Sequence, residues 1–157
     1  MGSGLYWWSF VGPSAHDVRE RFAREAVTLE ADDLAALDWL RRNVGPHEIV
    51  YRESFRASFG YAQWGGVSTP WTEHRAVALG HPIERLERRE AMLRAPPSRL
   101  LDYVDEGVVW FVLAPGDDHV SRLIAAWEPR RLVREAARFG ELRVYRVVDL
   151  PVDPGYR

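Results

Sequence analysis

The chain has 157 residues, of which 46% are hydrophobic and 28% are charged, and its formal net charge is −2. These values are typical of one globular domain, and they exclude a disordered chain and a basic nucleic-acid-binding domain. Cysteine and lysine are absent. Their absence excludes disulfides, thiolate catalysis, zinc–thiolate sites and lysine-based chemistry.

An aromatic segment, residues 5–11, opens the chain and is followed by a charged stretch up to residue 28. The aromatic segment is much shorter than the roughly 20 residues that cross a bilayer, and it lacks the cationic start of a signal peptide. Tryptophan and tyrosine are common where a membrane helix meets water. We expect residues 1–28 to be either the outer end of a membrane helix with its linker or a hydrophobic segment packed on the domain.

The clearest helix pattern covers residues 30–43. Its first turn is acidic and its last turn contains Arg41 and Arg42, an order that complements the helix dipole. The apolar face of this helix is expected to consist of Leu34, Leu37, Leu40 and Val44.

The remaining elements alternate between strands and helices. Strands are predicted at residues 48–51, 75–79, 107–113, 131–136 and 142–148, and helices at 83–94, 98–104 and 118–127. Residues 58–62 fit either a strand or a loop. Residues 107–113 are apolar without alternation, which is typical of a central strand that is buried on both faces.

This order of elements predicts the fold class and the domain boundaries. We expect a single α/β domain over residues 29–150, with a mixed, mostly parallel sheet, flanking helices and an antiparallel hairpin at the C-terminal edge. Residues 151–157 are expected to form a loose tail.

An irregular segment after the helix and first strand is the candidate binding site. Its aromatic rings would stack on the apolar faces of sugars, its polar groups would bind hydroxyls, and an arginine would grip a phosphate. The alternative is that the tryptophans fill the core. The candidate binding residues are Tyr61, Gln63, Trp64, Trp71, Glu73, His74, Arg75 and His81.

No complete catalytic or metal site is apparent. His74 and His81 with Glu73 or Glu84 are a conceivable metal set, but their spacing fits no metal motif, and ordinary polar residues flanking a strand are the simpler interpretation. There is no Gly-x-Ser-x-Gly elbow or glycine-rich phosphate loop. The paired carboxylates at 32–33, 105–106 and 117–118 are interpreted as helix caps and turn residues. We therefore expect no catalytic residue, metal or cofactor.

The order of the segments resembles the extracytoplasmic C-terminal domain of C-superfamily membrane glycosyltransferases and related polytopic membrane proteins. The similarity covers about residues 29–148 and includes LLDYVDEGVVWFVLAPGD at 100–117 and FGELRVYRV at 139–147. These enzymes use polyprenyl-phosphate sugars, and their catalytic carboxylates lie in loops between membrane helices, so no catalytic residue transfers to this chain.

The resemblance implies an accessory or recognition domain that does not catalyse by itself. Its expected location is the extracytoplasmic face of the cytoplasmic membrane. Its expected partners are a membrane-embedded part of the same or another protein and a glycan or polyprenyl-phosphate sugar, with no nucleic acid. A stand-alone enzyme with a His/Glu site and a non-catalytic protein-binding module remain the alternatives.

Overall fold

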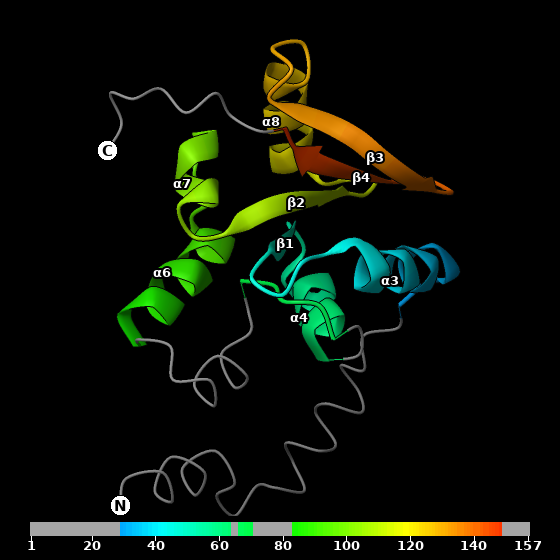
Figure 1. Ribbon diagram of the computed structural model, residues 1–157, viewed down its shortest axis with the longest axis horizontal. Coiled ribbons are helices and arrows are strands. Elements are labelled where there is room, and N and C mark those ends of the chain that lie inside the picture. The colour runs from blue at the N-terminus through cyan, green and yellow to red at the C-terminus, as the bar shows by residue number, and fades with distance from the viewer. Residues whose placement is uncertain (1–28, 64–65, 71–82, 149–157) are drawn as a thin grey trace, which may run out of the picture.

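A four-stranded mixed sheet forms the centre of the protein (Figure 1). The computed structural model describes residues 29–63, 66–70 and 83–148. The strands are β1 (Ile49–Arg52), β2 (Val108–Leu113), β3 (Val133–Phe139) and β4 (Leu142–Val147). Their order across the sheet is β1-β2-β4-β3.

The predicted α/β class, flanking helices and C-terminal hairpin are confirmed, but the sheet contains less parallel pairing than expected. β1 and β2 are parallel, whereas β4 is antiparallel to both β2 and β3. The hairpin inserts β4 directly beside the central strand, so two of the three described pairings are antiparallel. The strand expected at 75–79 lies outside the described residues.

Helices cover both faces of the sheet (Figure 1). The helices are α3 (Ala31–Asn43), α4 (Phe55–Gln63), α6 (Ile83–Arg94), α7 (Leu100–Val104) and α8 (Asp118–Trp127). α3 and α4 contribute to a core on one face, and α6, α7 and α8 contribute to a core on the other. None of the helices in these ranges has the length and apolar character needed to cross a membrane.

β2 belongs to both cores, which confirms the prediction of a central strand buried on both faces. Trp110 and Val112 pack on the α3–α4 side, and Phe111 packs on the other. The ring of Phe111 lies edge-on to those of Tyr103 and Trp127, with centroid distances of 5.2 and 5.5 Å. Such edge-to-face pairs add to the stabilisation that burial of the rings provides.

Two local expectations are wrong. Residues 58–62 are helical, as part of α4, because Ala57, Ser58 and Tyr61 lie three and four positions apart and are buried on one face of a helix. In α3, Leu34 is 55% exposed, and Ala36 is buried in the core with Leu37 instead.

The turn of the β3–β4 hairpin lies close to the start of α3. Gly140 has φ of +55°, a region that favours glycine, and a Cβ atom added there would lie 2.0 Å from Oδ2 of Asp32. The amide of the next residue, Glu141, lies 3.4 Å from the same oxygen. The backbone conformation therefore favours glycine at this position, and any Cβ would also force the Asp32 carboxylate to turn away.

We predict that Gly140→Ala lowers the free energy of unfolding by about 1.5–2 kcal/mol, because backbone strain adds to the loss of the contact between Asp32 and the amide of Glu141 when the Asp32 carboxylate turns away. Gly116→Ala is the matched control, since Gly116 also has a positive φ, of +86°, but has open space where the Cβ would lie. That control should lose only about 1 kcal/mol. Urea unfolding measures the loss of free energy of unfolding in both variants. Equal losses would show that the proximity of Asp32 to Gly140 adds nothing to the cost of a Cβ atom there.

Candidate functional site

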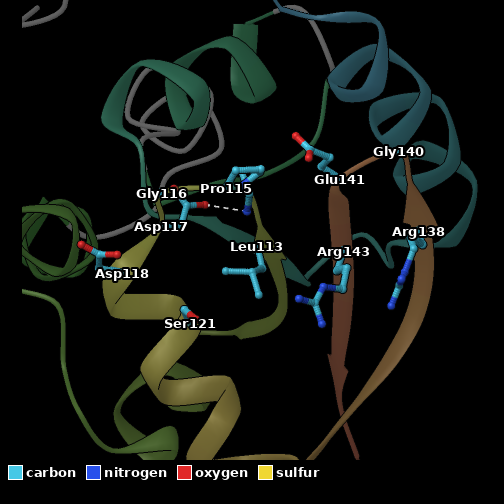
Figure 2. A pocket seen from close by; sticks show the side chains of 11 residues that line it. Leu113, Pro115, Gly116, Asp117, Asp118, Ser121, Arg138, Gly140, Glu141 and Arg143 are labelled. Atoms are coloured by element: carbon cyan, nitrogen blue, oxygen red, sulfur yellow. Dashed lines mark hydrogen bonds between the residues drawn. The ribbon is translucent and has the colours of Figure 1, made fainter.

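An open crevice of about 540 Å³ lies between the hairpin and the segment that joins β2 to α8 (Figure 2). Its volume is within the usual range of small-molecule sites, about 300–1,000 Å³. It lies beyond the carboxyl end of β2, where ligands commonly bind in α/β proteins. The lining residues are Leu113, Ala114, Pro115, Gly116, Asp117, Asp118, Ser121, Arg138, Gly140, Glu141 and Arg143.

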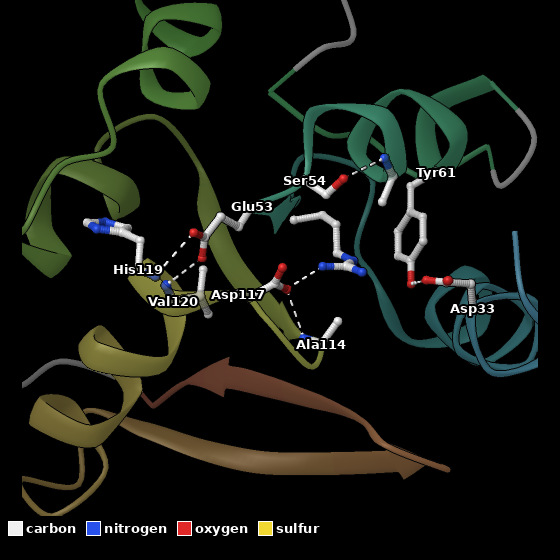
Figure 3. A network of polar contacts seen from close by, with 10 residues as sticks. Asp33, Glu53, Ser54, Tyr61, Ala114, Asp117, His119 and Val120 are labelled. Atoms are coloured by element: carbon white, nitrogen blue, oxygen red, sulfur yellow. Dashed lines mark hydrogen bonds and ion pairs between the residues drawn. The ribbon is translucent and has the colours of Figure 1, made fainter. Parts of the chain in front are cut away.

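Asp117 holds one wall of the crevice in place. Its Oδ2 atom accepts a hydrogen bond of 2.8 Å from the backbone N–H of Ala114, which closes the loop after β2. The same oxygen forms a buried ion pair with Arg52, the last residue of β1 (Figure 3). Of the two roles expected for the acidic pairs, Asp117 has that of a turn residue: it occupies the cap position of α8, but its side chain makes no capping hydrogen bond there.

Glu53 caps α8 from the end of the neighbouring strand. Its two carboxylate oxygens accept hydrogen bonds from the backbone N–H groups of His119 and Val120, at 3.1 and 2.8 Å (Figure 3). A carboxylate at this end of a helix also interacts favourably with the helix dipole. Two consecutive residues, Arg52 and Glu53, thus hold both the loop and the start of α8.

Burial dominates the electrostatics of the ion pair. It raises the pKa of Asp117 above the usual value, even though the charge of Arg52 and the N–H of Ala114 act in the opposite direction. The Nε atom of Arg52 is buried and has no hydrogen-bond partner within the part of the chain that the structure describes. Desolvation of both charges makes such a pair a poor source of net stability, so its main effect is to fix geometry.

Tyr61 is the one predicted binding residue whose side chain the structure describes. Its ring is fully buried, and its hydroxyl donates a hydrogen bond of 2.7 Å to Oδ1 of Asp33, which connects α4 to α3 (Figure 3). Burial first and Asp33 second raise the pKa of Tyr61. In this position the Tyr61 ring is a core contact and has no exposed face for stacking on a sugar.

The other predicted binding residues are not brought together by the described structure. Gln63 is the last residue of α4, and nothing further is described of its side chain. Outside the described residues lie Trp64, Trp71, Glu73, His74, Arg75 and His81. The conceivable metal set falls there too, apart from the exposed Glu84, and the described residues contain no group of three side chains that could hold a metal ion.

The described histidines lie away from the crevice. Nε2 of His119 is 3.1 Å from the carbonyl oxygen of Pro97 and 3.2 Å from the hydroxyl of Tyr103, so its ring joins α8 to the segment that leads into α7. Neither His119 nor His47 lines the crevice. Among the described residues, the crevice thus offers hydrogen-bonding groups and charges for binding but no imidazole for proton transfer.

The network of Arg52, Glu53 and Asp117 was missed in the sequence. Each residue follows or ends a strand of the parallel pair, and such positions meet at one edge of a sheet. That signal can be used only when β1 and β2 are known to be parallel neighbours, and no strand order was predicted from the sequence. The acidic pair at 117–118 instead suggested local capping.

We predict that Arg52→Met lowers the free energy of unfolding by about 3–5 kcal/mol, because it leaves the carboxylate of Asp117 buried without a counter-ion. The double variant Arg52→Met/Asp117→Asn should recover much of this loss, since an amide oxygen still accepts the N–H of Ala114. Arg42→Met removes an exposed pair with Asp38 and should cost about 0–1 kcal/mol. Urea unfolding measures all three, and a double variant no more stable than Arg52→Met would contradict the explanation.

Comparison with protein families, curated proteins and solved structures finds no match to this chain. The resemblance to membrane glycosyltransferases therefore stays a prediction from the sequence.

Proposed function

We propose that this chain is a recognition domain that binds a glycan in the crevice between the hairpin and α8. The observation that carries the proposal is the polar lining of that crevice. Residues with carboxylate, guanidinium and hydroxyl side chains line both walls, together with a glycine-containing loop. Sugar hydroxyls both donate and accept hydrogen bonds, so a lining with both kinds of group suits them.

The domain performs no bond-breaking step in this proposal. Glu53 and Asp117, the carboxylates nearest the carboxyl ends of β1 and β2, are engaged in holding the loop and the helix. A general acid or base must reach the reacting proton, and these two groups are already bonded to backbone amides. We assign the remaining lining carboxylates, Asp118 and Glu141, to binding sugar hydroxyls, in agreement with the non-catalytic accessory domain that the sequence resemblance implies.

The proposal extends to the protein in which the domain acts. We place it on the extracytoplasmic face of the cytoplasmic membrane, as an accessory domain beside a glycosyltransferase-like membrane-embedded part of the same or a partner protein. The ligand would then be an acceptor glycan or the sugar of a lipid-linked sugar. Support comes from the segment order at 100–117 and 139–147 and from the aromatic residues 5–11. Recovery of the native protein in the cytosolic fraction of its cells would contradict this location.

Amide chemical shifts test glycan binding directly. The probes are the methyl glycosides of glucose, galactose, mannose, N-acetylglucosamine and glucuronic acid, each titrated into the folded chain. At least one should cause saturable shifts confined to residues 113–121 and 138–143. Absence of saturable shifts there with every probe would overturn the proposal.

A pair of variants separates binding in the crevice from binding elsewhere. Asp118→Asn/Glu141→Gln should weaken the best probe about tenfold, because each amide still accepts a hydrogen bond and loses only the extra strength of a charged acceptor, about 0.7 kcal/mol per exposed site. The control is Glu128→Gln, an exposed carboxylate just beyond α8 that does not line the crevice. Equal affinity in both variants would place binding outside the crevice.

A further inference from the structure

Arg143 is a cation in the crevice without a carboxylate partner among the described residues. Its Nη1 atom donates one hydrogen bond of 3.3 Å, to the neutral hydroxyl of Tyr145. The other lining guanidinium, that of Arg138, is held by two hydrogen bonds of 3.0 and 3.1 Å from its Nε and Nη2 atoms to Glu135. The two arginines therefore differ: Arg138 is paired directly with Glu135, whereas Arg143 reaches the same carboxylate only through the hydroxyl of Tyr145, at 3.5 Å from Glu135. Arg143 forms no direct ion pair within the described residues, so its guanidinium can still bind a ligand.

The position of Arg143 directs this charge into the crevice. In β4 it pairs with Leu113, the last residue of β2, so it stands beside the point where the chain leaves the sheet. Figure 2 shows its side chain reaching from β4 into the space between the hairpin and α8, where Ser121 lies on the opposite wall. A guanidinium in such a place can bind a carboxylate or phosphate through two parallel hydrogen bonds.

Two further carboxylates of the crevice lining limit what the ligand can be. Asp118 and Glu141 line the same crevice and form no ion pair within the described residues. A small anion without donors would be repelled by them. A ligand that offers hydroxyl donors to the carboxylates and one oxyanion to Arg143 satisfies both requirements.

We infer that the ligand of this crevice is an acidic sugar and that Arg143 binds its oxyanion, either a carboxylate or a phosphate. The inference rests on the proposed glycan-binding function and names the class of sugar. Arg143 sets the preference for the acidic group, while Asp118, Glu141 and Ser121 take the hydroxyls that acidic and neutral sugars share.

Matched probes isolate the acidic group. Methyl β-D-glucuronide and methyl β-D-glucoside share one ring and differ at C6, which is a carboxylate in the first and a hydroxymethyl in the second. α-D-Glucose 1-phosphate, compared with methyl α-D-glucoside, tests a phosphate source. We expect at least one acidic probe to bind about tenfold more tightly than its neutral partner. The comparison with the larger difference shows whether the oxyanion is a carboxylate or a phosphate.

Variants at two arginines assign the preference. Arg143→Gln should abolish the difference in affinity between the acidic and the neutral probe, and Arg143→Lys should restore part of the preference. Arg134→Gln is the control, because Arg134 is an exposed residue of β3 that does not line the crevice, and it should change neither affinity.

The outcomes separate this inference from the function on which it rests. Equal binding of acidic and neutral probes, or a preference that survives Arg143→Gln, overturns the inference and leaves glycan binding intact. No binding of these probes by a chain that binds another neutral glycoside also overturns the inference alone. No binding of any glycoside overturns both.

Discussion

Two consecutive residues at the end of β1 determine the shape of the crevice wall. Arg52 pairs with Asp117 in the loop after β2, and Glu53 accepts the backbone N–H groups of His119 and Val120. Sixty-five or more positions of sequence separate the members of these contacts. The loop can therefore take this shape only when β1 and β2 are paired in their native register. The positions of the crevice residues depend on that pairing.

The main effect of the contacts of Arg52 and Glu53 is to fix the position of the loop and of the start of α8, and the buried ion pair adds little net stability. Burial raises the pKa of Asp117 despite the adjacent guanidinium, so the ion pair stabilises less than its close contact suggests. The helix α8 also takes its cap from another strand, whereas a serine or threonine at the cap position would act locally. The Arg52–Asp117 ion pair and the cap by Glu53 join the loop and α8 to the centre of the sheet. A wall held in this way presents its polar groups in a defined arrangement.

A second polar cluster fixes the opposite end of β2 in a comparable way. Glu48 accepts hydrogen bonds of 2.7 Å from the indole of Trp110 and 2.8 Å from the N–H of Gly45, and it pairs with Arg146 on β4. Burial acts to raise the pKa of Glu48, but these partners together outweigh it and leave the pKa lowered. Ionised Glu48 therefore stabilises the fold above its unfolded pKa of 4.5, and this contribution is lost as the pH falls through the lowered folded pKa.

Local sequence patterns predicted most helices and strands, because hydrophobic periodicity and the positions of glycine and proline determine the conformation of residues close in the chain. The helix at 83–94, the central strand and the C-terminal hairpin are confirmed. α4 was missed because a segment that contains Gly60 has weak helix propensity, and burial of Tyr61 in the folded protein decides its conformation.

The candidate site was much less predictable than the fold. The contact between the end of β1 and the loop after β2 depends on how these two strands, which are distant in the sequence, are aligned. The residue pattern within each segment does not specify that alignment. An acidic pair before a helix looks the same whether it caps that helix or reaches an arginine elsewhere. The crevice also needs the hairpin to lie beside β2, and this placement put Arg143 next to Leu113.

Hydrogen–deuterium exchange of three backbone amides tests the central claim most directly. The N–H groups of Ala114, His119 and Val120 lie in a loop and at a helix start, where amides usually exchange fast. If Arg52 and Glu53 hold this wall, these amides should exchange about as slowly as those of β2, and Glu53→Ala should speed exchange at His119 and Val120 while sparing β2. Fast exchange of the three amides in the unaltered protein would contradict the account.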